Sequence, residues 1–151
     1  MPRTFRPRSA LVLVACAGCA AGWRATSAQD LGPSLELRPG QEVTFPVTIA
    51  NGQVTPGKAH GLKPGAAPVD GEITVRLIKH GLSPYAELMA REKTSEPVDF
   101  MATGLIGNIK IDEIRVCGQV DAPTSARIAS GSWRVSLNRF SIGGKAGLGC
   151  P

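Results

Sequence analysis

The chain has 151 residues, of which 42% are hydrophobic, 19% charged and 5% aromatic. This length predicts one domain and excludes a multidomain enzyme, and the hydrophobic fraction excludes a wholly disordered chain. Glycine (18) and proline (12) are abundant, which favours frequent turns over long helices.

The formal net charge of +5 is carried mainly by residues 1–28, which contain four arginines and no acid. Without them, Lys plus Arg falls from 17 to 13 against 12 Asp plus Glu, so residues 29–151 are nearly neutral. Their charges alternate in sign and do not form the cationic cluster that neutralises several phosphates. Nucleic acid is therefore excluded as a partner.

Residues 1–28 have the pattern of a secretory signal peptide. An arginine-rich start is followed by an apolar run from Ala10 to Gly22 and then by small residues up to Ala28. The run is shorter than the ~20 apolar residues needed to span a bilayer. It also lacks the amphipathic period of a helix belonging to the fold. We expect cleavage between Ala28 and Gln29 and a secreted or periplasmic protein.

The same segment also contains an alternative targeting signal. Leu13-Val14-Ala15-Cys16 resembles a bacterial lipobox, although the apolar run before Cys16 is short. In that alternative Cys16 carries lipid and the protein is a membrane-anchored lipoprotein. Without lipidation at Cys16, no association with a membrane is expected.

Two cysteines remain after removal of the signal segment, Cys117 and Cys150. An even pair in an oxidising compartment predicts a disulfide. The bridge closes a loop of about 34 residues and contributes roughly 3–4 kcal/mol by the loop-entropy model. Two cysteines with no nearby histidine cannot complete a zinc site, so neither a metal nor a cofactor is expected.

Alternation of apolar and polar residues with a period of two predicts about eight short strands. Together they indicate a single antiparallel β-sandwich over residues 29–151, immunoglobulin-like or of Greek-key type. The expected strands span residues 34–38, 42–50, 72–80, 84–92, 98–103, 109–116, 124–129 and 133–139.

Local details refine this pattern. Pro46 lacks an N–H and predicts an edge strand or a bulge, while Asn51-Gly52 predicts a hairpin turn. The Asp112-Glu113 pair marks a bulge or a tight turn. In the last strand, Trp133 is expected to face inward with Val135 and Leu137.

Two segments leave alternatives open. Residues 83–93 alternate as a strand, but their composition and a Ser-Pro start also suit a short helix. Residues 52–71 form a long loop rich in glycine and proline, in which Lys58, His60 and Lys63 supply positive charge. This loop is either a binding loop for an anion or an acidic partner, or a disordered connector, and the composition favours the connector.

Catalytic motifs are absent from the sequence: there is no Gly-x-Ser-x-Gly elbow and no His-Glu-x-x-His pair. We therefore expect a non-enzymatic binding or structural module of the bacterial envelope or extracellular space. Its partner would be an envelope protein or a glycan, recognised by a sheet edge or by the 52–71 loop. The alternative is a small extracytoplasmic enzyme or enzyme accessory, which a pocket joining His80 to Glu87 or Asp99 would support.

Overall fold

The computed structural model describes residues 35–61, 65–143 and 150. The expected signal segment 1–28, with Cys16 and the Ala28–Gln29 boundary, lies outside the described residues, as does Lys63. Within these described ranges, no helix has the length and apolar character needed to cross a membrane.

Every regular element of the described residues is a strand. The strands are β1 (Leu35–Leu37), β2 (Glu42–Ala50), β3 (Gln53–Pro56), β4 (Glu72–Lys79), β5 (Tyr85–Lys93), β6 (Val98–Ile106), β7 (Ile109–Val116), β8 (Pro123–Ala129) and β9 (Arg134–Ile142). Residues 83–93, for which a helix was the alternative, contribute strand β5.

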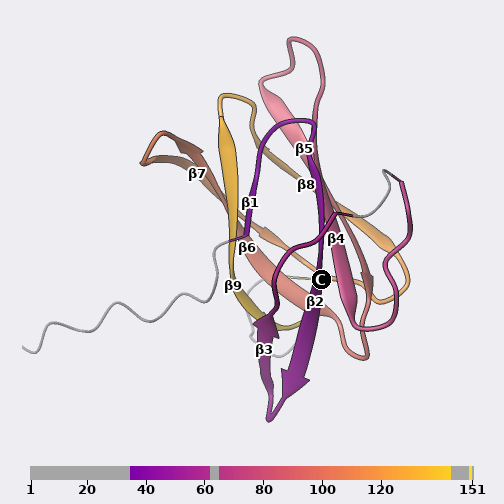
Figure 1. Ribbon diagram of the computed structural model, residues 1–151. Helices are drawn as coiled ribbons and strands as arrows, with labels where there is room; N and C mark the ends of the chain where they lie inside the picture. The colour runs from indigo at the N-terminus through magenta and orange to yellow at the C-terminus, as the bar shows by residue number, and fades with distance from the viewer. Residues whose placement is uncertain (1–34, 62–64, 144–149, 151) are drawn as a thin grey trace, which may run out of the picture.

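The strands form two sheets that pack against each other (Figure 1). One sheet has the order β1-β9-β6-β7 and the other has the order β3-β2-β4-β5-β8. All pairings between these named strands are antiparallel. The prediction of an all-β chain with two packed antiparallel sheets is therefore confirmed.

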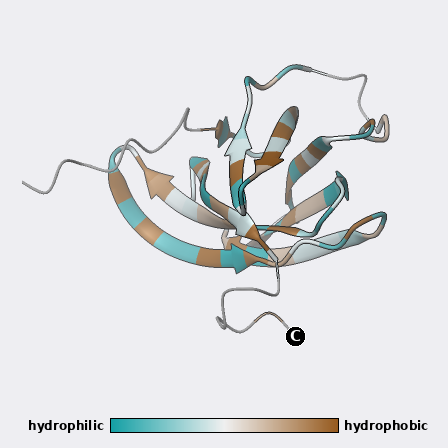
Figure 2. Cartoon of the chain, turned by 90° about the horizontal axis from the view of Figure 1, so that it is seen from below, coloured by the Kyte–Doolittle hydropathy of each residue, from teal (hydrophilic) through white to brown (hydrophobic). Residues whose placement is uncertain are grey.

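The core lies between the sheets and follows the predicted alternation. Hydrophobic and hydrophilic residues alternate along most strands (Figure 2), so each strand buries one side and exposes the other. The largest buried side chains come from eight of the strands, all except β3, and are mainly aliphatic. They are Leu37, Phe45, Ile73, Val75, Leu77, Leu88, Val98, Phe100, Val116, Ile128, Val135 and Leu137.

A bulge in β9 changes which residues reach the core. Asp99 pairs with Ser141 and Met101 pairs with Asn138, so two β9 residues lie opposite Phe100 alone. One of them, Arg139, has a positive φ of 52°. The extra residue shifts the alternation by one position, and Phe140 turns inward in place of Arg139.

The expectation that Trp133 faces inward is wrong. Trp133 precedes β9, which begins at Arg134, and its exposed fraction is 71%. Val135 and Leu137 are buried as expected. Trp133 therefore belongs to the turn before β9, and the alternation of inward and outward side chains along the strand does not apply to it.

Pro46 does not lie in an edge strand, because β2 runs between β3 and β4. It stands where β2 changes partners: Glu42–Pro46 pairs with β4, and Val47–Ala50 pairs with β3. A missing N–H is tolerated at this changeover, where the Pro46 carbonyl still accepts from Gly57 N at 2.7 Å. The predicted Asn51-Gly52 turn is confirmed, since both residues have positive φ.

The segment 52–71 is not one loop throughout. Gln53–Pro56 forms β3, and His60 exchanges backbone hydrogen bonds with Thr44 at 2.8 and 3.2 Å. The sequence did not predict this strand, because it has only four residues and is flanked by glycine on both sides. In β7, Asp112 pairs with Gly104 and Lys110 pairs with Leu105, so Asp112 lies beside a bulge at Ile111.

Candidate binding surface

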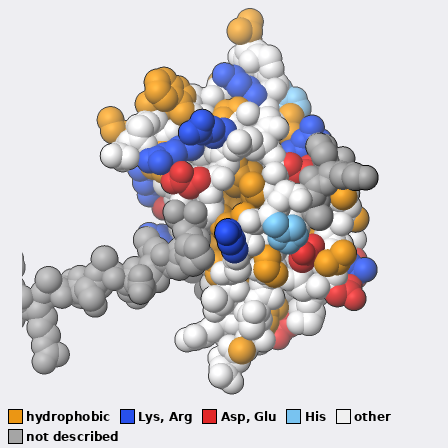
Figure 3. All heavy atoms as spheres, in the orientation of Figure 1, with side chains coloured by type: hydrophobic (Ala, Val, Ile, Leu, Met, Phe, Trp, Pro, Cys, Tyr) orange, Lys and Arg blue, Asp and Glu red, His pale blue; other side chains and the backbone are white. Residues whose placement is uncertain are grey.

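Exposed apolar side chains gather where the β6–β7 hairpin meets the turn before β9. Ile106, Ile109 and Ile111 of the hairpin are exposed. Trp133 lies beside them, because its backbone N–H donates to Leu105 O at 2.9 Å. Figure 3 shows hydrophobic side chains at this end of the molecule, at upper left, next to Lys and Arg side chains. This cluster, the Trp133 surface, contains four of the seven large hydrophobic residues exposed in the described part of the chain.

The Trp133 surface has a rigid base. Ser132, which is buried, donates its hydroxyl to Ala129 O at 2.8 Å and packs against Gly104 of β6. A Cβ on Gly104 would overlap the Ser132 side chain. The close approach fixes the turn before β9, so the exposed Trp133 ring stands on an ordered backbone.

Arg134 joins this turn to the hairpin tip and to β1. Its guanidinium donates to Gly107 O at 2.7 and 3.1 Å, to Asn108 Oδ1 at 2.9 Å and to Glu36 Oε1 at 3.2 Å. These contacts engage all three nitrogens of the guanidinium. Arg134 therefore holds the turn, the hairpin tip and β1 together.

A hollow of about 440 Å³ opens next to the Trp133 ring. It is lined by Arg38, Gly107, Asn108, Trp133 and Arg134. Three side-chain donors of these lining residues have no hydrogen-bond partner within the part of the chain that the structure describes: the Arg38 guanidinium, the Asn108 amide nitrogen and the Trp133 indole nitrogen. One aromatic face with several free donors is able to stack on a ring and to bind acceptor oxygens around it.

Two of the charged residues of the predicted binding loop, Lys58 and His60, lie within the described residues. His60 Nε2 contacts Glu72 Oε1 at 3.1 Å, which fastens this segment to β4. Lys58 is exposed and has no side-chain partner among the described residues. Of the two predicted loop residues that the structure describes, only His60 therefore makes a defined side-chain contact.

His80 and Glu87, which the sequence analysis named together for the enzyme alternative, lie in contact. His80 Nε2 lies 3.0 Å from Glu87 Oε2, and both side chains are partly exposed. They line a hollow of about 300 Å³ with Ser83, Tyr85, Ala86 and Arg127. Asp99 does not belong to this group, because it is buried beside Arg115.

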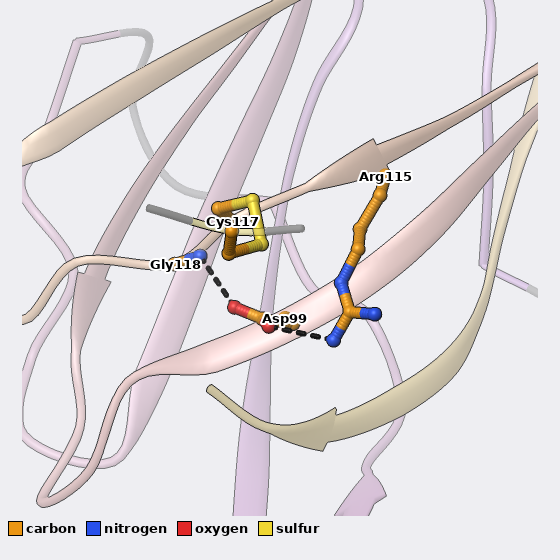
Figure 4. The surroundings of a disulfide bond; sticks show 5 residues. Asp99, Arg115, Cys117 and Gly118 are labelled. Atoms are coloured by element: carbon orange, nitrogen blue, oxygen red, sulfur yellow. Dashed lines mark hydrogen bonds and ion pairs between the residues drawn. A yellow bond between two sulfur atoms is a disulfide. The ribbon is translucent and has the colours of Figure 1, made fainter. Parts of the chain in front are cut away.

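Cys117 and Cys150 lie at disulfide-bonding distance, with their Cα atoms 5.7 Å apart, as predicted. Figure 4 shows the surroundings of this bond. The buried Asp99 carboxylate accepts from Arg115 Nη2 at 2.8 Å and from Gly118 N at 3.0 Å. Asp99 thus holds the chain on both sides of Cys117.

A second buried acid, Glu92, lies against the same segment. Its Oε2 accepts from Val98 N at 3.0 Å, and a Cβ on Gly118 would overlap its Oε1. Burial raises the pKa of Glu92 to about 7, while the hydrogen bonds from Val98 and Thr94 oppose this shift. The tight packing around Glu92 indicates a structural role at the junction of β5, β6 and the disulfide.

Within the described residues, no three His, Cys, Asp or Glu side chains are arranged to hold a metal ion. The sequence did not identify the Trp133 surface, because it placed Trp133 in the core. The available signal was the Ser130-Gly131-Ser132 turn directly before it, which breaks the strand period.

The geometry defines a two-sheet antiparallel protein with an aromatic surface at one end. Comparison with known proteins finds no family model, no curated protein and no solved structure that matches this chain. The functional conclusions therefore rest on the chemistry of its own residues.

Proposed function

We propose that the chain is a non-enzymatic binding module of the bacterial envelope or extracellular space, and that it recognises a glycan through the Trp133 surface. The main support for this proposal is Trp133, whose exposed fraction is 71%. It lies on an ordered turn, and residues with free hydrogen-bond donors line the hollow beside it. A cluster of large apolar side chains left in water on a fixed backbone is typical of a recognition site.

A glycan suits this surface for a chemical reason. A saturated sugar ring has an apolar face and a rim of hydroxyl oxygens. The Trp133 indole offers one flat apolar face, and Arg38 and Asn108 supply donors beside it. The hollow of about 440 Å³ lies in the usual range for small-ligand sites.

Export is inferred from the signal-like segment 1–28 and is supported by the Cys117–Cys150 pair. The intact mass of the protein recovered from a bacterial host tests the route. A chain starting at Gln29 supports release after cleavage, and a diacylated Cys16 supports the lipoprotein alternative. A chain that keeps Met1 and reduced thiols overturns export.

We also infer a Greek-key connection within the sandwich. Strand β9 returns to pair with β6 after β8 has joined the opposite sheet, and β7 and β8 lie side by side. This gives the order β9-β6-β7-β8, which is that of a Greek key.

Tryptophan fluorescence provides a direct binding test. After cleavage behind Ala28, Trp133 is the only tryptophan of the chain, because Trp23 is removed. We expect envelope polysaccharide fragments to change the emission of the secreted protein in a saturable way. A Trp133→Ala variant should lose retention on the insoluble polysaccharide, as measured by co-sedimentation.

Leu82→Ala is the matched control, since Leu82 is fully exposed on the turn between β4 and β5. It removes an apolar side chain that is more exposed than Trp133 from another part of the molecule. Retention of Leu82→Ala together with loss of Trp133→Ala supports the proposal. Equal retention of both variants, or no retention of the unmodified protein on any polysaccharide, overturns it.

A second candidate function rests on the His80–Glu87 contact at 3.0 Å. A carboxylate that orients a histidine is a common element of general-base catalysis, so this hollow favours a hydrolytic enzyme or an enzyme accessory. The test is a screen of ester, amide and glycoside substrates with the unmodified protein and His80→Gln. Activity that disappears in His80→Gln supports the enzyme, and identical rates exclude this pair.

A further inference from the structure

The outer face of the five-stranded sheet brings two arginines together. Arg76 of β4 pairs in register with Met89 of β5, and Thr74 pairs with Arg91. Arg76 and Arg91 are therefore diagonal neighbours on the same side of an antiparallel pair, a separation within reach of long side chains. Both residues are exposed, and the inward positions between them are filled by buried Val75 and Ala90.

Neither guanidinium has a hydrogen-bond or ion-pair partner among the described residues. The acid opposite Arg76 in register is Glu42, whose carboxylate instead accepts from Gly65 N at 3.2 Å. The next cation along β5, Lys93, is paired with Asp70 at 3.0 Å. Two unpaired like charges side by side repel each other, and an anion between them would remove this cost.

The two arginines line one small hollow. Its volume is about 70 Å³, and it lies under residues 65–66. The lining residues are Glu42, Gly65, Ala66, Thr74, Arg76, Met89 and Arg91. A water molecule occupies about 30 Å³ of liquid, so the hollow admits a small oxyanion but not a sugar ring.

We propose that Arg76 and Arg91 bind a phosphate group, either as free phosphate or as the terminal phosphate of a larger molecule. Each guanidinium presents a planar fork of donors that matches two phosphate oxygens. Two cations also match the double charge of a phosphate monoester. Glu42 reduces the local positive charge, and with both arginines the hollow keeps a net charge of +1. This site is independent of the Trp133 surface.

Calorimetry with inorganic phosphate tests the site, at constant ionic strength and with chloride as the reference anion. The protein is expressed from the full-length sequence and used as the bacterial host releases it. We expect saturable binding that weakens at least tenfold in Arg76→Gln and in Arg91→Gln. Arg91→Lys keeps the charge but loses the fork, so it should bind with intermediate affinity.

Arg127→Gln is the matched control, because Arg127 lies on the same outer face opposite Glu87. It should bind phosphate as the unmodified protein does. Equal weakening of all three glutamine variants would show general charge attraction and overturn the site. Unchanged affinity in Arg76→Gln and Arg91→Gln would also overturn it.

Vesicles distinguish the two sources of the phosphate group. Vesicles of phosphatidylcholine with phosphatidic acid expose a terminal phosphate, and vesicles of phosphatidylcholine alone do not. Co-sedimentation with the first that is lost in Arg91→Gln assigns the site to a lipid headgroup. Binding of inorganic phosphate without co-sedimentation assigns it to a soluble phosphate, and absence of both overturns the proposal.

Discussion

Phe45 of β2 packs edge-on against Phe140 of β9, with ring centroids 5.7 Å apart and planes at 73°. The contact joins the two sheets, and Phe140 also lies 5.5 Å from Phe100. Phe140 reaches this position only because β9 bulges at Arg139. A side-chain cluster at the centre of the protein thus depends on one backbone irregularity.

The strain at that bulge can be measured. Arg139 has a φ of 52°, a region that costs a residue with a Cβ more than it costs glycine. We expect Arg139→Gly to raise the free energy of unfolding by about 0.5–1 kcal/mol in urea denaturation. Arg139→Val should lower it, because a β-branched residue is disfavoured at positive φ. Destabilisation by glycine would contradict this account of the bulge.

Glu92 makes stability depend on pH. Burial raises its pKa in the folded protein to about 7, above the ordinary value of 4.5. The folded state therefore binds the Glu92 proton more tightly than the unfolded state does. The resulting contribution to the free energy of unfolding is fully present below pH 4.5 and is lost as the pH rises through 7. The whole effect corresponds to about 3 kcal/mol.

The measurement is chemical denaturation of the unmodified protein and Glu92→Gln between pH 5 and 8. Glutamine keeps an oxygen that accepts from Val98 N but has no charge to bury. The stability difference in favour of Glu92→Gln should widen as the pH rises. Parallel curves for the two proteins would show that Glu92 does not titrate in this range.

Removal of the disulfide should lower stability substantially. Cys117 and Cys150 are 33 positions apart, and opening a loop of this length costs about 3–4 kcal/mol by the loop-entropy model. We expect this loss in Cys117→Ser/Cys150→Ser by denaturant titration. A reducing agent should cause a similar loss in the unmodified protein and none in the double variant. Sensitivity of the double variant to the reducing agent would refute a role for this bond.

A substitution at Gly104 tests how tightly the base of the Trp133 surface is packed. A Cβ there would overlap Ser132 and lie 3.2 Å from Ile128 Cδ1. We expect Gly104→Ala to cost about 1–3 kcal/mol, as overpacking of a filled core does. Ser132→Ala removes the overlapping hydroxyl, so the double variant should be more stable than the sum of the single effects predicts. Strict additivity would show that the two residues do not compete for space.

The amino-acid sequence by itself determined all the strands except β3, the Asn51-Gly52 turn and the cysteine pair. These features are local or nearly so: alternation with a period of two needs only one buried face, and positive φ needs only the right residues in a turn. Leu37, Val75 and Ile128 accordingly lie in the core, on the faces that the alternation assigned.

Only the tertiary structure decided which strands are neighbours and in which register. That choice placed Pro46 inside a sheet, turned Phe140 inward in place of Arg139, and brought Arg76 beside Arg91. It also left Trp133 outside, because the preceding turn packs on Gly104, a residue from a different strand. Pairing and register arise from contacts between distant segments that bury the most surface together, and no single segment carries that information.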